Sequence, residues 1–115
     1  MKILLIISAS IAIKRCYEII KRLSANQVII DCILTDNAQK MIKIKKLKQI
    51  VNGSIFTNQS ETKQKMLHIS LSRKNDLIIV CPATANIIAK FANGYANDLA
   101  STSLIASNKQ IIVIP

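Results

Sequence analysis

A turn of small polar residues follows a buried apolar run near residue 80 and could hold an anion. The apolar run Leu77–Val80 and Cys81 lead into the turn Pro82-Ala83-Thr84-Ala85-Asn86. This turn presents a hydroxyl, a side-chain amide and the free backbone N–H groups of a helix start, which are groups that bind phosphate or carboxylate. Thr84 and Asn86 are also common helix caps, so ligand contact and simple capping both fit these two residues.

Two further segments carry groups suited to chemistry. Ser8-Ala9-Ser10 follows the first apolar run, and His68 is the single histidine of the chain. A histidine changes its charge near neutral pH and can take or hold the proton of a thiol. A lone histidine on a short amphipathic helix is also a common surface or packing residue, so both roles stand open for His68.

The elements that must position these groups alternate along the chain. Apolar runs predict strands, at residues 2–7, 27–34, 54–57, 76–80 and 110–114. Segments with helical periodicity lie between them, at residues 10–23, 37–51, 67–74, 84–92 and 98–106. This alternation is typical of strand–helix units that build a parallel sheet. We therefore predict a Rossmann-like α/β fold, doubly wound with helices on both faces of the sheet, and a mobile surface loop at residues 58–65.

The predicted topology brings two of the polar segments together. In the common doubly wound order the first strand lies beside the fourth, and the direction of winding reverses between them. Ligands in such sheets bind in the crevice at that point, at the carboxyl ends of the strands. The loop at Ser8-Ala9-Ser10 and the turn at residues 82–86 should therefore form one site.

Length and composition bound the possible functions. A chain of 115 residues with 50% hydrophobic content can bury one core, so we predict a single domain over residues 1–115. The net charge of +10 rests partly on the lysines of residues 40–48, which read as the solvated side of a helix. With two Phe, two Tyr and no Trp to stack on bases, we predict no nucleic-acid partner.

The apolar start and the cysteines predict where the protein works. The apolar run at residues 3–7 is too short to cross a membrane, so we expect no membrane partner. Cys16, Cys32 and Cys81 are far apart and lie among apolar residues, which is typical of buried thiols in the reducing cytoplasm. The absence of a Cys-x-x-Cys pair or a histidine cluster predicts no metal site.

In combination, several motifs resemble one enzyme family. They are Ser8-Ala9-Ser10-Ile11-Ala12, Met66-Leu67-His68-Ile69, Pro82-Ala83-Thr84-Ala85-Asn86, Ala92-Asn93-Gly94 and Asn97-Asp98-Leu99. The chain resembles the homo-oligomeric flavin-containing Cys decarboxylases along its full length, and most of all the phosphopantothenoylcysteine decarboxylases among them. The resemblance implies the flavoprotein fold and FMN as the cofactor.

The resemblance also implies an activity. Those enzymes oxidise the thiol of 4'-phosphopantothenoylcysteine with FMN, release CO2, and return the hydride to give 4'-phosphopantetheine for coenzyme A biosynthesis. Other members of the family are flavin prenyltransferases and peptide cysteine decarboxylases, and either activity is an alternative. A non-catalytic flavin-binding or assembly remnant is an alternative from a different functional class.

The family's functional residues map onto matching positions of this chain. The implied cofactor contacts are Ser8, Ser10, Ile11, Thr35, Ala83, Thr84, Ala85 and Asn86. His68 matches the family's active-site histidine, which acts across a subunit contact, so a trimer-based homo-oligomer is expected.

The chain departs from the family pattern at two places. Ile6 and Ala9 stand where the family has glycines in the first loop. Pro115 aligns with the first residue of the family's Pro-x-Met-Asn motif, so we expect a C-terminally truncated domain. The apolar strand at residues 110–114 would then form an open edge, and a second chain could supply the missing part.

Overall fold

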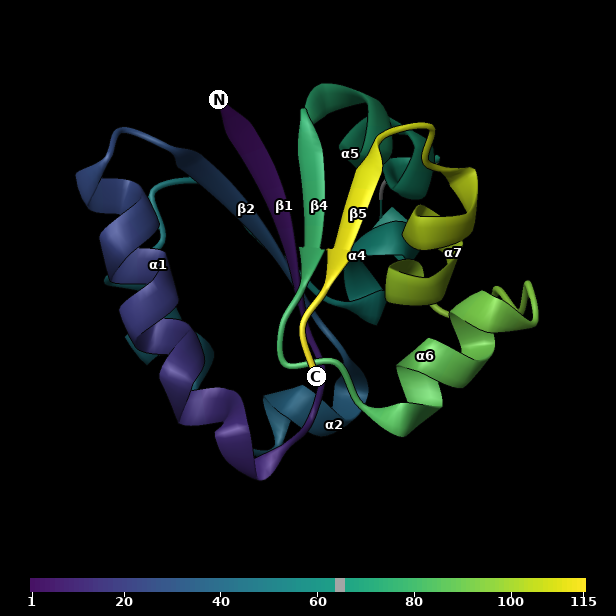
Figure 1. Ribbon diagram of the computed structural model, residues 1–115, viewed down its shortest axis with the longest axis horizontal. Helices are drawn as coiled ribbons and strands as arrows, with labels where there is room; N and C mark the ends of the chain where they lie inside the picture. The colour runs from purple at the N-terminus through teal and green to yellow at the C-terminus, as the bar shows by residue number, and fades with distance from the viewer. Residues whose placement is uncertain (64–65) are drawn as a thin grey trace.

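The computed structural model describes residues 1–63 and 66–115, and its centre in that part of the chain is one parallel β-sheet (Figure 1). The strands are β1 (Lys2–Ile7), β2 (Ile29–Leu34), β3 (Ile55–Phe56), β4 (Leu77–Val80) and β5 (Gln110–Val113). Their spatial order is β3-β2-β1-β4-β5, and every neighbouring pair is parallel. The predicted doubly wound order, with the first strand beside the fourth, is confirmed.

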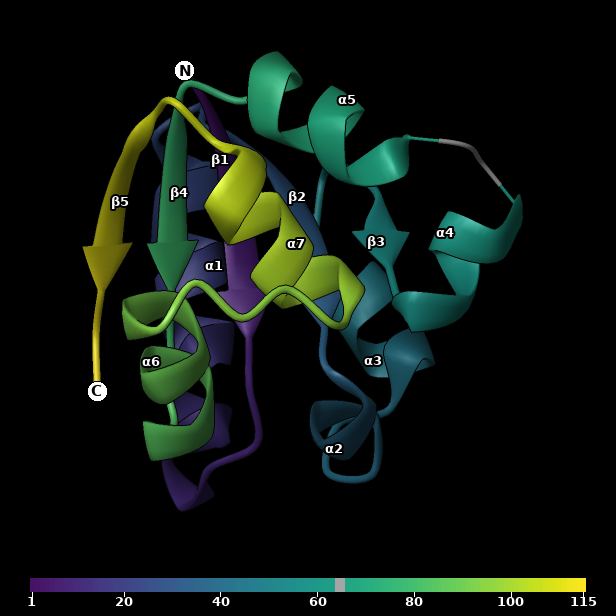
Figure 2. The ribbon, with the colours of Figure 1, turned by 90° about the vertical axis from the view of Figure 1, so that its right-hand side faces the viewer.

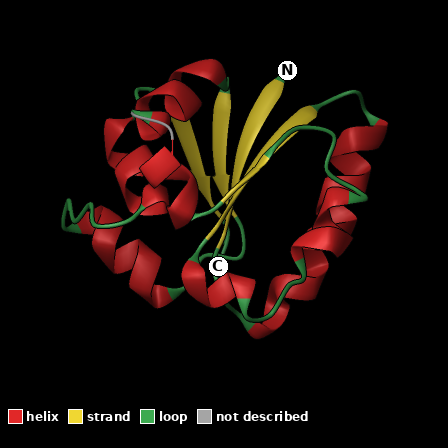
Figure 3. Cartoon of the chain, turned by 180° about the vertical axis from the view of Figure 1, so that it is seen from behind, coloured by secondary structure: helices red, strands yellow, loops and turns green. Residues whose placement is uncertain are grey.

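Helices cover both faces of this sheet (Figures 1 and 3). They are the 3-10 helix η1 (Ile11–Lys14), α1 (Arg15–Ala25), α2 (Asp36–Gln39), α3 (Ile44–Lys48), α4 (Asn58–Lys63), α5 (Leu67–Lys74), α6 (Ala85–Ala92) and α7 (Leu99–Ala106). Buried side chains of η1, α1, α2 and α3 share one core cluster, and those of α5, α6 and α7 share another. The two clusters lie on opposite faces of the sheet.

The central strand β1 supplies both clusters because successive side chains of a strand point to opposite faces. Ile3, Leu5 and Ile7 enter the cluster under α1, whereas Leu4 and Ile6 enter the cluster under α5 and α7. All five side chains are buried. A strand that is apolar without a break is what a parallel sheet covered on both faces requires.

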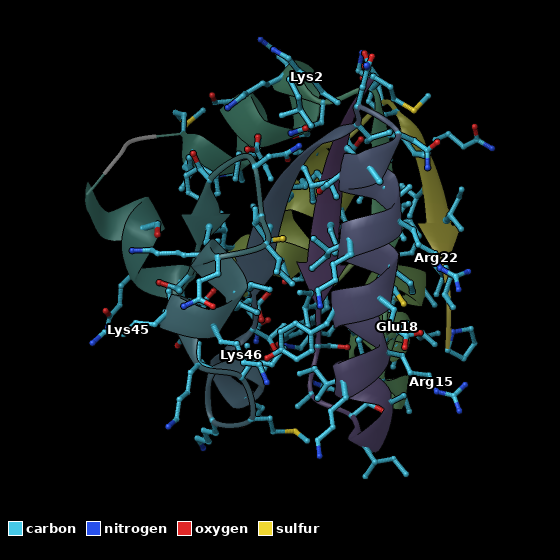
Figure 4. All side chains as sticks on the ribbon, turned by 90° about the vertical axis from the view of Figure 1, so that its left-hand side faces the viewer. Lys2, Arg15, Glu18, Arg22, Lys45 and Lys46 are labelled. Carbon is cyan, nitrogen blue, oxygen red and sulfur yellow. The ribbon has the colours of Figure 1, made fainter. Side chains whose placement is uncertain are left out.

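Charged side chains surround the core on the α1 side. Arg15 and Arg22 of α1 and Lys45 of α3 are exposed and point away from the body of the protein (Figure 4). The Lys46 ammonium lies 4.9 Å from the centre of the Tyr17 ring, which brings α3 against α1. In the part of the chain that the structure describes, no helix is long and apolar enough to span a membrane.

The prediction of one helix over residues 37–51 is wrong. The structure has two short helices there, α2 and α3, and the backbone of Lys43 between them is extended, with φ −77° and ψ 127°. The buried residues explain the break. Ile42 follows Ala38 by four residues, but Leu47 follows Ile42 by five, so one straight helix cannot direct all three into the core.

The prediction of a mobile loop over residues 58–65 is also wrong where it can be compared, because residues 58–63 form α4. The segment is polar and lacks an apolar stripe, so periodicity gave no signal for a helix. The backbone N–H of Thr57 donates to Ser60 Oγ at 3.0 Å, and the N–H of Ser60 donates to the Thr57 oxygen at 2.9 Å. Residues 64 and 65 of the predicted loop lie outside the described residues.

The other predicted elements agree with the structure to within a few residues. The helix predicted at 67–74 is α5, and those predicted at 84–92 and 98–106 are α6 and α7, each preceded by its capping residue. The helix predicted at 10–23 begins as η1 and continues as α1 to Ala25. The strand predicted at 27–34 starts at Ile29, because the backbone of Gln27 has a positive φ of 64° that a strand does not allow.

Candidate functional site

A cavity of about 460 Å³ opens at the carboxyl edge of the sheet. Its lining comes from the segments that follow β1, β2, β3 and β4, from α6 and from the start of α7. It consists of Ser8, Ala9, Thr35, Asp36, Asn37, Asn58, Thr84, Asn86, Ile87, Lys90 and Asp98. Its volume falls in the range of roughly 300–1,000 Å³ that is usual for ligand and cofactor sites. The cavity therefore lies where a doubly wound sheet is expected to bind its ligand.

Ser8 joins the two polar segments that form one wall of this cavity. Its hydroxyl donates to the backbone oxygen of Pro82 and accepts from the backbone N–H of Thr84 at 3.1 Å. The side chain is 3% exposed, so both bonds are shielded from water. The predicted convergence of the first loop with the turn at residues 82–86 is confirmed by these contacts.

Thr84 and Thr35 both begin a helix while lining the cavity. Thr84 Oγ1 accepts from the N–H of Ile87 at 3.3 Å and caps α6. Thr35 Oγ1 accepts from the N–H of Ala38 at 3.2 Å and caps α2. The other N–H groups in the first turn of α6 have no partner within the helix, and the helix dipole adds positive potential at that end. Capping and cavity lining are thus combined in the same residues.

The opposite wall is a hydrogen-bonded group on α4, α6 and α7. Lys90 Nζ lies 3.4 Å from Asp98 Oδ2, and Asp98 Oδ1 accepts from the N–H of Ser101 at 2.8 Å. Asn58 Oδ1 accepts from the N–H of Leu99 at 2.9 Å, which ties α4 to the start of α7. Burial alone would raise the pKa of the Asp98 carboxyl, but the Ser101 hydrogen bonds and the Lys90 ammonium outweigh it and lower that pKa. Asp98 therefore stays ionised at neutral pH.

Four of the predicted cofactor residues line the cavity, namely Ser8, Thr35, Thr84 and Asn86. Ser10 and Ile11 do not. Ser10 Oγ accepts from the N–H of Ala12 at 3.2 Å and caps η1, and the Ile11 side chain is 97% exposed.

The remaining predicted residues do not line the cavity. Ala83 is buried, and its N–H donates to the oxygen of Ile114 at 2.8 Å. Ala85 is exposed in the first turn of α6. His68 is half-buried in the first turn of α5, on an element that packs against α7. Its acid–base role stays a prediction.

Sequence reasoning missed several residues of the lining. Asp36 and Asn37 follow the end of β2 directly, so the rule that found the loops after β1 and β4 could have found them. Asn58 belongs to a segment that was predicted as a loop, and Lys90 to a predicted helix. No sequence motif marked Asn58 or Lys90 as a site residue. Asp98 stands at the start of the helix predicted over residues 98–106; it caps α7 through a capping box with Ser101, and it also lines the cavity.

The three cysteines are buried in the core cluster that α1 covers. Cys16 Sγ donates to the backbone oxygen of Cys81 at 3.1 Å, directly before the turn at residue 82. Burial, with a smaller effect of Cys81, raises the pKa of Cys16 to about 12, and burial also raises the pKa of Cys32 and of Cys81. These are inert packing thiols. Among the described residues, no group of three or more His, Cys, Asp or Glu side chains is arranged to hold a metal ion.

The sequence matches a protein family and is similar to proteins of coenzyme A biosynthesis. The family model described as Flavoprotein matches residues 1–115. The coenzyme A biosynthesis bifunctional protein CoaBC of Vibrio cholerae is 32% identical over 118 residues, and that of Escherichia coli K12 is 34% identical over 118 residues. Each match covers 99% of this chain but 29% of the relative, so the chain spans less than a third of those proteins.

Solved structures with the same fold agree with this match. The structure of the FMN-dependent cysteine decarboxylase TvaF superposes with a TM-score of 0.91 at 24% identity, covering 98% of this chain and 71% of that chain. The peptidyl-cysteine decarboxylase EpiD superposes with a TM-score of 0.81 at 27% identity, covering 97% of this chain and 68% of that chain. The arrangement of strands and helices described above is therefore that of the cysteine decarboxylase structures.

Proposed function

This chain belongs to the flavoprotein family, and from that premise we propose that it holds FMN at the carboxyl edge of its sheet. We further propose that it forms part of an FMN-dependent decarboxylase that converts 4'-phosphopantothenoylcysteine to 4'-phosphopantetheine in coenzyme A biosynthesis. The substrate follows from the family resemblance of the sequence motifs, and the CoaBC relatives are named for coenzyme A biosynthesis. The observation that carries the proposal is the cavity where the loop after β1 and the turn after β4 meet through Ser8 and Thr84.

The residues present fit a phosphorylated cofactor. A phosphate needs several N–H or O–H donors at one place, and the first turn of α6 supplies backbone N–H groups beside the Asn86 amide. Thr35 lines the cavity from the end of β2 and adds a hydroxyl. The cavity volume of about 460 Å³ suits a flavin-sized ligand, and Ile87 gives it one apolar surface.

The chain's own residues bind and orient, while the flavin supplies the redox chemistry. FMN held in this cavity would supply the hydride chemistry, because oxidising a thiol-bearing carbon removes a hydride from that carbon and a proton from the sulfur. Ser8 fixes the turn at Thr84, so the donors of α6 are already in place before a ligand binds. The pair of Lys90 and Asp98 keeps the opposite wall in position.

His68 completes the proposed machinery from a neighbouring copy of the chain. It does not line the cavity of its own chain. We therefore propose that it holds the thiol proton at the cavity of a neighbouring copy, within a homo-oligomer built on trimers. We place the assembly in the cytoplasm, where the three buried thiols would stay reduced.

A titration with FMN tests the cofactor. Purified protein should quench the fluorescence of added FMN, and the bound flavin should absorb visible light. Asn86→Ala removes one amide from the cavity and should weaken binding about tenfold, the effect of losing about 1.4 kcal/mol. Asn97→Ala changes an exposed asparagine that does not line the cavity and should bind FMN unchanged. Absence of binding at saturating FMN would contradict the cofactor assignment.

Turnover separates the proposed substrate from the alternatives. Release of CO2 from phosphopantothenoylcysteine, and not from a peptide ending in cysteine, is expected. The position of His68 outside the cavity favours one alternative, a flavin-binding protein without turnover. His68→Asn should abolish CO2 release while leaving FMN binding intact if the chain is an enzyme. A chain that binds FMN but releases no CO2, with or without His68, would be the non-catalytic protein.

A further inference from the structure

The side chain of Asn58 lines the cavity and is held in one orientation by α7. Its Oδ1 accepts from the N–H of Leu99 at 2.9 Å. Leu99 is the first residue of α7, and an N–H in the first turn of a helix has no acceptor within that helix. A backbone N–H can only donate, so the atom that faces it must be the amide oxygen. The Asn58 amide can therefore face the cavity only with its NH2 group.

Asn58 is more firmly placed than the other amide side chains of the lining. Asn37 and Asn86 are exposed, whereas Asn58 is half-buried. α7 lies between α4 and α6 and packs against both, so the amide and the N–H that orients it belong to one packed group of helices (Figure 2). A donor whose direction is fixed before a ligand arrives loses less side-chain entropy on binding. Asn58 is thus a preorganised donor.

The charges near Asn58 favour an uncharged acceptor. Lys90 Nζ lies 3.4 Å from Asp98 Oδ2, so the ammonium on this wall is already paired with a carboxylate. Asp36 adds a second carboxyl group to the lining. A phosphate is favoured instead at the first turn of α6, where backbone N–H groups and the helix dipole supply positive potential. The two walls therefore suit a ligand with a phosphate at one end and carbonyl oxygens at the other.

We propose that Asn58 is a specificity-determining residue, whose NH2 group donates to a carbonyl oxygen of the flavin ring. This inference rests on the proposed function, because it takes FMN as the ligand of the cavity. FMN carries its phosphate at the end of the ribityl chain and its carbonyl groups on the ring, as the two walls require. A shielded donor left without an acceptor costs binding free energy, so Asn58 discriminates against a ligand that has no carbonyl at this position.

Asn58→Asp separates ligand recognition from the structural role of this residue. The carboxylate keeps an oxygen for the Leu99 N–H and adds negative charge at the start of α7, so the melting temperature of the flavin-free protein should stay the same or rise. The NH2 donor is replaced by an oxygen that repels the ligand carbonyl. FMN affinity, measured by fluorescence titration, should therefore fall at least about tenfold. Asn58→Ala removes both groups and should lower the melting temperature as well as the affinity.

Riboflavin shows which end of the ligand Asn58 contacts, because it has the flavin ring without the phosphate. The ratio of the dissociation constants of Asn58→Asp and the parent should be the same for riboflavin as for FMN. Asn86→Ala, at the proposed phosphate end, should weaken FMN binding and leave riboflavin binding unchanged. A carbonyl that accepts a hydrogen bond absorbs infrared light at lower frequency. The carbonyl bands of bound FMN should therefore move to higher frequency in Asn58→Ala, which a purely structural role would not cause.

Gln59→Glu is the matched control, because it makes the same change from amide to carboxylate at the next residue, which is exposed and does not line the cavity. It should bind FMN as the parent does. Equal FMN affinity of Asn58→Asp and the parent, or a loss seen with FMN but not with riboflavin, would overturn this inference and leave the cofactor assignment standing. If the parent bound neither flavin, the proposed function would fail and this inference with it.

Discussion

Ser8 offers the sharpest test of how the site is held together. Ser8→Ala removes the hydroxyl that donates to the Pro82 oxygen and accepts from the Thr84 N–H. Each bond contributes roughly 0.5–1.5 kcal/mol net, and the N–H left without its partner adds to the loss, so we expect a destabilisation of about 2 kcal/mol. At about 4 °C per kcal/mol for a domain near this size, the melting temperature should fall by about 8 °C.

The measurement is urea and thermal unfolding of the flavin-free protein followed by circular dichroism. Ser10→Ala is the matched control, because it changes a serine of the same loop that makes one cap bond to the Ala12 N–H at 3.2 Å. It should cost about 0.5–1 kcal/mol. FMN affinity should fall with Ser8→Ala, because the donors of α6 are no longer held in position. An unchanged stability of the flavin-free Ser8→Ala protein would refute the bridging role, even if FMN binding were lost.

Three further predictions concern stability. Gly53→Ala places a methyl group against the backbone oxygen of Ile30 and 2.8 Å from its carbonyl carbon, so denaturant unfolding should show a loss of about 3 kcal/mol. Asp98→Asn weakens the contact with Lys90 and should cost about 1 kcal/mol at pH 7. Folding lowers the pKa of Asp98, so the contribution of its carboxylate to stability is present above the ordinary pKa of 3.8 and disappears as the pH falls through the lower folded value. Below that pH the free energies of unfolding of Asp98→Asn and of the parent should converge. Burial raises the pKa of Cys16 from 9.0 to about 12, so the contribution of this thiol to stability is complete below pH 9 and is lost as the pH rises toward 12. The free energy of unfolding should therefore fall across that pH range. In Cys16→Ala the decrease should be smaller.

Local signals in the sequence predicted most of the fold. Uninterrupted apolar runs identified β1 and β4, because a strand covered on both faces needs an apolar residue at each position. Asp98 and Thr84 were recognisable as helix starts, because a cap acts on N–H groups three residues away. Such information lies within a few neighbouring residues and can be read without the structure.

The helices at residues 36–48 and 58–63 could not be read in the same way. The extended backbone at Lys43 follows from the need to bury both Ile42 and Leu47 under one face of the sheet, and that need exists only in the folded protein. α4 is polar, and it packs against α5, the next helix along the chain, and against α7, whose first residue Leu99 lies 41 positions after Asn58. Tertiary contact decided both segments.

The sequence by itself determined that two polar loops follow neighbouring strands, and hence that Ser8 and Thr84 would meet, since strand order in a parallel sheet is constrained by chain connection. Only the tertiary structure decided the rest of the cavity. Asn58 reaches Leu99 across 41 positions of sequence, and Lys90 meets Asp98 through the packing of α6 on α7. Contacts of this kind depend on side-chain geometry between elements that no short motif encodes, which is why the opposite wall of the site became visible only in the folded chain.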